Sequence, residues 1–399
     1  MPLPESLSPP RRVLMGPGPS VVDERVLRAM ALPTIGHLDP AFIAVMDEVR
    51  AMLQEALGTT NPLTVPMSGT GSAGMETCFV NLVEPGDRVL IGVNGVFGTR
   101  MCEVARRCGA EVTQVHAPWG RALAVEDFAS AAAGRSFSVV ALVHAETSTG
   151  VLQPLEGFAE LASSLGALLL VDAVTSLGGS RIDMDASGID ALYSGTQKCL
   201  SCPPGLAPVS LSPRAVERLG TRREAPLSWY LDLTLIARYW LGVEQGGGGA
   251  RAYHHTAPIN AVYGLHEALR ITLSEGLEAR YARHREHSQA LRLGLQALGL
   301  VLPVPVPERL PQLTLVEAPD GVDESAVRRH LLEDFDLEIG GGLGGLAGRA
   351  WRIGLMGSGC TRANVELCLR ALESGLNAQG WKPPESGLTV AQAHYKEME

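Results

Sequence analysis

The sequence has no excess of basic residues, no long apolar run and no regular cysteine pattern. Its 33 Lys and Arg are outnumbered by 43 Asp and Glu, which leaves a net charge of −10. This charge argues against a general nucleic-acid-binding surface, because such surfaces need clustered cations to displace counterions from phosphates. No apolar stretch approaches the roughly 20 residues that a membrane span requires. We therefore expect small molecules as ligands, and neither nucleic acid nor a membrane as a partner.

The 7 cysteines are odd in number and scattered along the chain, which is typical of a reducing compartment rather than of a disulfide framework. The opening MPLPESLSPPRR has two arginines but no apolar segment after them, so no secretory signal is expected. We predict a cytoplasmic enzyme. Cys199 and Cys202 have the spacing of a redox or metal pair, but no second pair accompanies them, so no metal site is predicted.

Short apolar runs alternate with helical patterns up to about residue 275. Apolar runs of about four to eight residues, each followed by a polar or Gly-rich turn, are typical of buried strands in a largely parallel sheet with helices on both faces. A GGGG run at 246–249 predicts a flexible loop. The predicted strands are DRVLIGV (87–93), SVVALVHA (138–145), GALLLVDAV (166–174), IDALYSG (189–195) and LAPVSLS (206–212).

The length of 399 residues favours more than one domain. After the sheet region the pattern becomes a long helix, a strand-like QLTLVEAP and two further helices, which is typical of a smaller α+β domain. We predict an N-terminal arm at 1–14, a large α/β domain at 15–275, a small C-terminal domain at 276–383 and a tail at 384–399.

Residues 69–74 read GTGSAG, which has the spacing of a dinucleotide-binding turn. That motif should follow a strand directly, with an acidic residue at the end of the next strand. Here Asp87 begins the next strand-like run instead, which weakens the dinucleotide interpretation. What remains is a helix start with free backbone N–H groups and two hydroxyls, a suitable anion site. An ordinary helix N-cap explains the same residues.

Two further predicted strand ends place a carboxylate and an amine at the same edge of the sheet. Asp172 stands in VDAVTSLGG, and Lys198 stands among small residues in YSGTQKCLSCPPG. Taken singly, they are explained as a turn aspartate and a surface lysine. Together with an anion site they meet the needs of pyridoxal 5′-phosphate, which takes a lysine for its Schiff base, a carboxylate at its pyridine nitrogen and a phosphate cup.

Short motifs in a fixed order carry a resemblance over nearly the whole chain: LMGPGPS, IGHLDPAF, SGTGSAGMET, NGVFGTR, HAETSTGV, VDAVTSLGG, YSGTQKCL, YHHTAP and WRIGLMG. On these motifs the chain resembles, from about residue 13 to 380, the class V (fold type I) aminotransferases, specifically the alanine–glyoxylate and serine–pyruvate aminotransferase group. The resemblance implies a large domain with a mostly parallel seven-stranded sheet, a smaller C-terminal α+β domain, and a homodimer with active sites shared between subunits.

The resemblance also implies roles for single residues. Lys198 would hold the cofactor covalently and carry protons, and Asp172 would pair with the pyridine nitrogen. Phe97 would stack on one face of the cofactor, where the animal enzymes have Trp, and Val174 would cover the other. The remaining expected contacts are Thr147 beside the cofactor oxygen, Thr70, Gly71, Ser72 and Gln197 around the phosphate, and Tyr253 and Thr256 reaching the phosphate from the neighbouring subunit.

Three further residues are predicted to bind the substrate. Arg352 in WRIGLMG matches the family's substrate-carboxylate arginine, and a guanidinium holds a carboxylate through two parallel hydrogen bonds. Taken without the resemblance, Arg352 would be interpreted as a structural ion-pair partner. Gly18 and His37 complete the predicted substrate site.

The predicted reaction transfers the amino group of a small amino acid, alanine or serine, to a 2-oxo acid, with glyoxylate as the expected acceptor. A close alternative is ureidoglycine–glyoxylate aminotransferase, which resembles this chain in GTQKCLS, HAETSTG and WRIG but has Asn and Gln where Tyr253 and His37 stand here. A cysteine desulfurase or lyase of the same fold would carry His in place of Gln197. A cofactor-binding regulator would need a basic DNA-binding domain, for which the 12-residue arm has no room.

Overall fold

The computed structural model describes residues 1, 3–242 and 250–398 of the chain. The loop predicted for the glycine run at 246–249 lies outside these residues.

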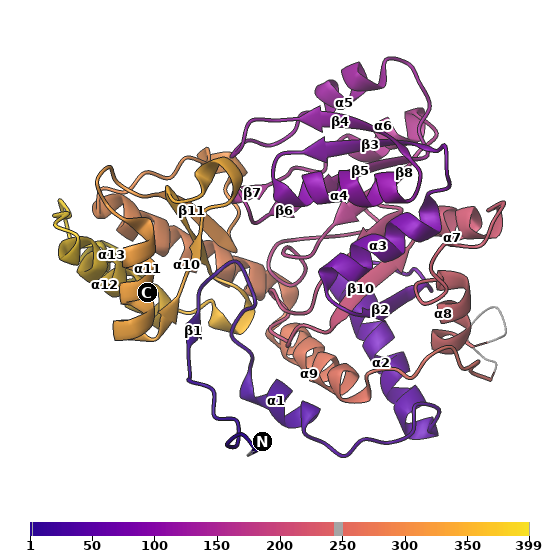
Figure 1. Cartoon of the computed structure of the whole chain (residues 1–399), viewed down its shortest axis with the longest axis horizontal. Coiled ribbons are helices and arrows are strands. Elements are labelled where there is room, and N and C mark those ends of the chain that lie inside the picture. Colours follow the sequence, from indigo (N-terminus) through magenta and orange to yellow (C-terminus); the bar gives the residue numbers. More distant parts are fainter. Residues whose placement is uncertain (2, 243–249, 399) are drawn as a thin grey trace.

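A seven-stranded sheet organises the larger part of the chain (Figure 1). Neighbouring strands run parallel from β4 through β3, β5 and β8 to β9, whereas β10 pairs antiparallel with both β9 and β2. The mostly parallel seven-stranded sheet is therefore confirmed. In order across the sheet, the strands are β2 (Thr64–Ser68), β10 (Leu206–Leu211), β9 (Ala191–Tyr193), β8 (Leu168–Asp172), β5 (Val139–Val143), β3 (Arg88–Val93) and β4 (Glu111–His116).

The central strands are apolar at every position because both of their faces are covered. All residues of β5 (VVALV) and of β8 (LLLVD) are buried, which is typical of a parallel sheet between helical layers. The polar Asp172 is the last residue of β8 and the exception in these runs. The accompanying helices are α1 (Glu24–Met30), α2 (Pro40–Leu57), α3 (Gly71–Leu82), α4 (Val96–Arg107), α5 (Val125–Ala132), α6 (Phe158–Ser164), α7 (Pro213–Gly220), α8 (Leu233–Trp240) and α9 (Ile259–Glu275).

Helix α2 shows how local sequence sets these boundaries. The Asp39 side chain caps the helix by accepting a hydrogen bond from the Ala41 amide at 2.8 Å, and Pro40 occupies the first helical turn, where no amide donor is needed. Gly58 ends the helix in the left-handed conformation with φ of 62°, which a residue without a Cβ adopts at little cost.

The C-terminal part packs helices on a three-stranded antiparallel sheet of order β11–β14–β13. Strand β1 (Val13–Leu14) pairs in parallel with β12, which ties the N-terminal segment to this part. In Figure 1 the helices α11, α12 and α13 lie at the left of the molecule, whereas β4 and α5 lie at its top. The elements are α10 (Leu277–Ala297), β11 (Leu313–Glu317), α11 (Glu324–Phe335), β12 (Leu337–Glu338), β13 (Gly340–Gly341), β14 (Ala350–Gly354), α12 (Arg362–Ala378) and α13 (Gly387–Met398).

Buried apolar side chains form two main clusters, one reaching from Val26 to Leu269 and one from Ala290 to Tyr395 with Met15 added. The segment predicted as a tail, 384–399, contains α13, which packs on α10 and α12. Its Ala391 and Tyr395 belong to the second cluster, so this segment is part of the C-terminal packing rather than an extension from it. The boundaries at 14, 275 and 383 stay a prediction. Among the described helices, none has both the length and the apolar character needed to cross a membrane.

Candidate active site

A cavity of about 170 Å³ lies at the carboxyl ends of β5, β8 and β9 and at the start of α3. In parallel sheets this edge is where ligands bind. The cavity is lined by predicted site residues, namely Thr70, Gly71, Ser72, Phe97, Thr147, Asp172, Val174, Gln197 and Lys198. It is also lined by residues that the sequence analysis did not name, namely Met75, Arg100, Val143, Ala145, Thr175 and Tyr193.

The start of α3 forms a cradle for an anion. Thr70 is the N-cap residue but its side chain makes no capping hydrogen bond, so it does not satisfy the first amides of the helix. A Cβ at Gly71 would stand 2.8 Å from a methyl carbon of Val174, so only glycine brings the backbone this close to the cavity wall. The side-chain oxygen of Gln197 is buried and has no hydrogen-bond partner among the described residues. The free amides at the start of α3 and the close backbone approach at Gly71 fit a phosphate group, whereas the Gln197 oxygen can only accept a hydrogen bond from a bound group.

Asp172 is held in place from two sides. One carboxylate oxygen accepts a hydrogen bond from the Val174 amide at 2.8 Å, and the other accepts one from the Tyr193 hydroxyl at 2.7 Å. The residue is only 3% exposed. Burial raises the pKa of Asp172 to about 7, and the two hydrogen bonds oppose this shift. A buried carboxylate of this kind is prepared to receive a positive partner from the cavity.

Lys198 lies between β9 and β10 and is covered by the N-terminal segment. Its ammonium group donates a hydrogen bond to the carbonyl oxygen of Pro17, and its own carbonyl oxygen accepts one from the Ser20 hydroxyl at 2.7 Å. Burial lowers the pKa of Lys198 from 10.5 to about 8. Because a lower pKa leaves more of the amine unprotonated near neutral pH, Lys198 is activated as a nucleophile and as a proton acceptor.

Gly18 is packed directly against this lysine. Its φ is +108°, and a Cβ at this position would stand 2.4 Å from the Lys198 nitrogen. We predict that Gly18→Ala displaces the lysine and lowers kcat about 10-fold or more, because small misplacements of reacting groups are costly. The matched control is Gly16→Ala, since a Cβ at Gly16 meets its nearest atom only at 3.7 Å. Equal steady-state rates for the two variants would contradict the prediction.

Arg352 reaches the edge of the cavity from β14. Its Nε donates to the carbonyl oxygen of Gly341 at 2.7 Å, and a terminal nitrogen donates to the carbonyl oxygen of the cavity residue Thr147 at 3.3 Å. Burial lowers the pKa of Arg352, and the nearby Glu146 carboxylate opposes that shift. Arg352 does not itself line the cavity, and its guanidinium is fixed by backbone contacts, one of them with the cavity residue Thr147.

Glu146, in the short strand β6 (Ala145–Glu146), is a site residue that the sequence analysis missed. Its carboxylate is fully buried and accepts hydrogen bonds from the Phe97 amide at 3.0 Å and from the Ser148 hydroxyl at 2.6 Å. The N-cap of α4 is Gly95, which has no side chain to cap the helix. Glu146 therefore supplies the cap from the short strand β6 and holds the backbone of Phe97, a residue that lines the cavity.

Arg100 also escaped prediction, although it stands in the motif NGVFGTR. Its guanidinium lies 4.9 Å from the centre of the Phe97 ring and donates to the Ser72 hydroxyl at 3.2 Å. The contact adds positive charge next to the anion cradle.

His37, Tyr253 and Thr256 are not among the residues that line this cavity. Tyr253 and Thr256 are exposed, and the His37 ring lies 5.0 Å from the Tyr253 ring. The His37 carbonyl oxygen accepts a hydrogen bond from the Tyr239 hydroxyl at 2.8 Å. The roles predicted for these three residues stay predictions.

Cys199 and Cys202 are both buried and free. Burial raises the pKa of each thiol to about 12, which keeps them protonated and poorly suited to metal binding or redox exchange. Among the described residues, no cluster of His, Cys, Asp or Glu has the arrangement of a metal site.

Comparison with known proteins places this architecture in a family. The aminotransferase class-V family matches residues 27–344. Alanine–glyoxylate aminotransferase from Rattus norvegicus is 42% identical, covering 94% of this chain and 91% of the relative. (S)-Ureidoglycine–glyoxylate transaminase from Bacillus subtilis is 39% identical, covering 93% and 92%. The crystal structure of alanine–glyoxylate aminotransferase from Nostoc sp. superposes with a TM-score of 0.91 at 49% identity, covering 94% of this chain and 97% of that one. The chain belongs to the class V aminotransferases and has the fold type I architecture of that family.

Proposed function

We propose that this aminotransferase uses pyridoxal 5′-phosphate to transfer the amino group of alanine or serine to glyoxylate. The observation that carries the proposal is the meeting of Lys198, Asp172 and the start of α3 in one cavity. The similarity to alanine–glyoxylate aminotransferases over most of both chains supports the choice of substrates.

The residues of the cavity fit the cofactor. The backbone amides of Gly71 and Ser72, the hydroxyls of Thr70 and Ser72 and the side-chain NH2 group of Gln197 would donate hydrogen bonds to the phosphate. Asp172 would pair with the ring nitrogen, and Phe97 and Val174 would cover the two faces of the ring. When bound, the cofactor supplies an electron sink for the negative charge that develops at the substrate α-carbon.

Lys198 performs the proton transfer. Its amine accepts the proton that leaves the substrate α-carbon, because burial has brought its pKa to about 8, close to the working pH. Asp172 keeps a proton on the ring nitrogen by offering a fixed negative charge, held by Val174 and Tyr193.

Arg352 binds and orients the substrate. Its guanidinium is anchored to the backbone of Gly341 and Thr147, so a substrate carboxylate meets a preorganised partner. A two-point grip on that carboxylate turns the α-C–H bond toward Lys198.

We further propose a homodimer in the cytoplasm, with Tyr253 and Thr256 of one subunit reaching the phosphate of the other. The exposure of both residues in the single chain supports this arrangement. A competing donor is (S)-ureidoglycine, because the Bacillus subtilis transaminase is also a near relative. The side chains at Tyr253 and His37, which differ from the Asn and Gln of that enzyme type, favour alanine or serine.

The test is the absorption spectrum of the purified holoenzyme before and after single additions of L-alanine, L-serine, L-cysteine and ureidoglycine, with the products identified. We expect alanine or serine to convert the cofactor to its amine form, with release of pyruvate or hydroxypyruvate, and glyoxylate to reverse the change. Conversion by ureidoglycine alone would replace the proposed donor. Release of alanine and sulfide from cysteine would replace the reaction class.

A further inference from the structure

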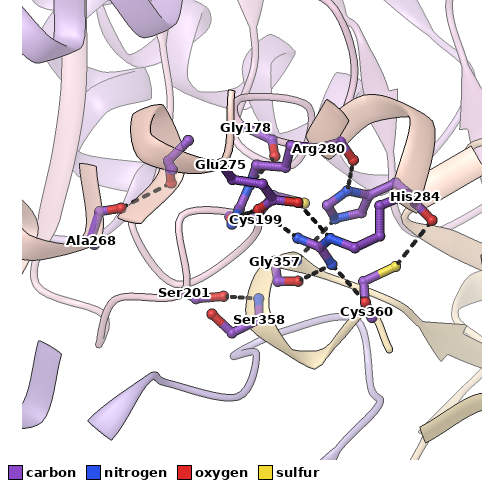
Figure 2. Close-up of polar contacts among 12 residues, drawn as sticks. Gly178, Cys199, Ser201, Ala268, Glu275, Arg280, His284, Gly357, Ser358 and Cys360 are labelled. Atoms are coloured by element: carbon purple, nitrogen blue, oxygen red, sulfur yellow. Dashed lines mark hydrogen bonds and ion pairs between the residues drawn. The ribbon is translucent and has the colours of Figure 1, made fainter. Parts of the chain in front are cut away.

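A cluster of ion-paired residues lies outside the cavity, at the junction of α9 and α10. Arg280 is only 1% exposed, yet its guanidinium forms an ion pair with Glu275 at 2.5 Å. The same guanidinium donates to the carbonyl oxygen of Cys199 at 2.6 Å and to that of Gly178 at 2.9 Å. Figure 2 shows Arg280 beside Glu275, Cys199 and Gly178.

The next turn of α10 continues the cluster toward the loop after β14. Arg283 pairs with Glu275 at 2.6 Å and donates to the carbonyl oxygens of Gly357 at 3.0 Å and Cys360 at 2.6 Å. His284 Nε2 accepts a hydrogen bond from the Gly357 amide at 3.0 Å. Its Nδ1 must then carry the hydrogen, which it donates to the carbonyl oxygen of Arg280 at 2.7 Å. Burial lowers the pKa of His284 to about 3, so the ring is neutral.

The two loops gripped by this cluster also touch each other. The Ser201 hydroxyl accepts a hydrogen bond from the Ser358 amide at 2.7 Å (Figure 2). A Cβ at Gly357 would stand 2.0 Å from the Ser201 hydroxyl oxygen and 2.6 Å from the carbonyl oxygen of Cys199. The loop after Lys198 and the loop after β14 therefore pack without any spare space.

These connections join the two ends of the substrate site. Cys199 directly follows Lys198, and Gly357 stands five residues after Arg352. None of Glu275, Arg280, Arg283 and His284 lines the cavity. Arg280 is buried, whereas Glu275 and Arg283 are each 26% exposed. Burying an ion-paired guanidinium such as that of Arg280 is expensive, and apolar side chains of similar size are often as good for stability. Stability alone therefore does not explain this cluster. Its hydrogen bonds to both loops indicate that it fixes the position of one loop relative to the other.

We propose that Glu275, Arg280, Arg283 and His284 are positioning residues that fix the distance between Lys198 and Arg352. This inference rests on the proposed function, in which the substrate amine reacts near Lys198 while its carboxylate sits on Arg352. An amino acid spans the two with a fixed length, so a shift of about 1 Å between them costs on the order of 100-fold in rate.

The experiment compares two probes that react with the carbonyl group of the bound cofactor. Aminooxyacetate carries a carboxylate for Arg352, and O-methylhydroxylamine does not. The ratio of their second-order rate constants, followed by the absorbance of the holoenzyme, measures how well Arg352 is placed relative to the cofactor. Arg352→Met gives the ratio expected when the carboxylate is not recognised.

The variants are Arg283→Met, Arg283→Lys and, as a matched control on the same helix, Arg285→Met at an exposed position. We expect Arg283→Met to lower the ratio about fivefold or more and to raise the KM for alanine about 10-fold, while the rate with O-methylhydroxylamine stays within about twofold of the wild type. Arg283→Lys keeps the charge opposite Glu275 and should recover part of the ratio. Arg285→Met should match the wild type.

If the cluster only stabilises the fold, the ratio of the two rate constants should not depend on Arg283. An unchanged ratio in Arg283→Met, or equal losses with both probes, would overturn the positioning role. If Arg283→Met does not fold, the decision falls to Arg283→Lys, in which an unchanged ratio also overturns it. Failure of the proposed function is seen separately, in the wild type, as an absence of transamination with any donor.

Discussion

Lys198→Ala abolishes transamination and leaves the fold in place. We expect kcat to fall by on the order of 10³-fold or more, because the variant loses both covalent attachment of the cofactor and the proton carrier. The fold should tolerate the change because burial disfavours the charged amine, as its pKa of about 8 indicates. The loss of a buried ammonium group therefore removes an unfavourable charge together with its packing contacts.

The measurement has two parts. Transamination is followed with the best donor, and folding is followed by circular dichroism and thermal unfolding of the cofactor-free protein. The control is Lys382→Ala, which removes an exposed lysine. Activity in Lys198→Ala above about one hundredth of the wild-type rate would contradict its role, since general acid–base catalysis alone contributes roughly 10²- to 10⁴-fold.

The sequence alone predicts the strands that are marked by a continuous apolar run in the sequence. β3, β5, β8, β9 and β10 are apolar runs that end at turns, and each was recognised as a strand. β2 and β4 were missed. The run of β2 contains Pro66, which argues against a strand interior but is tolerated here at the edge of the sheet. β4 lies at the other edge and mixes polar with apolar residues.

Strand direction is not encoded in such runs. β10 looks like the parallel strands in composition, yet it pairs antiparallel with both neighbours. The direction of β10 depends on the path of the loop that connects β9 to β10. That loop contains Lys198. The sequence pattern therefore located the lysine after a strand but could not show how the chain turns there.

Some site residues could likewise be predicted from their place in the sequence, and others could not. Asp172 ends β8 and Lys198 lies in the loop that follows β9, and both were predicted as site residues from these positions. Glu146 and Tyr193 act through partners distant in sequence, Phe97 and Asp172, at 3.0 Å and 2.7 Å. Tyr193 lies within a run that was predicted as a buried strand, and a buried hydroxyl usually finds a partner. That is the one signal that could have pointed to it.

Asp172→Asn should lower kcat by about 10²- to 10³-fold, the range that follows loss of one preorganised electrostatic partner. The amide is close in shape to the carboxylate and can still accept a hydrogen bond from the Val174 amide, now held at 2.8 Å. What it loses is the negative charge that keeps the cofactor ring nitrogen protonated. The effect should appear in kcat, measured with a saturating donor, with a smaller change in cofactor affinity.

The same substitution should stabilise the cofactor-free protein at alkaline pH. Burial raises the pKa of Asp172 from 3.8 to about 7 in the folded protein, so the folded state binds this proton more tightly than the unfolded state does. The associated stability is fully present below pH 3.8 and is lost as the pH rises through about 7. Asparagine does not ionise. Its advantage in thermal unfolding temperature should therefore be large at pH 8 and shrink toward pH 4.

These two results together distinguish a carboxylate kept for chemistry from one kept for stability. A structural carboxylate, paired and hydrogen-bonded, has a lowered pKa, and its loss weakens the fold most at alkaline pH. Asp172 has the opposite shift, because desolvation outweighs the hydrogen bonds from Val174 and Tyr193. A less stable Asp172→Asn apoprotein at pH 8 would show that the carboxylate supports the fold. A more stable but nearly inactive variant would show that the buried charge lowers the stability of the folded protein. The carboxylate would then be kept for its interaction with a cationic partner in the cavity.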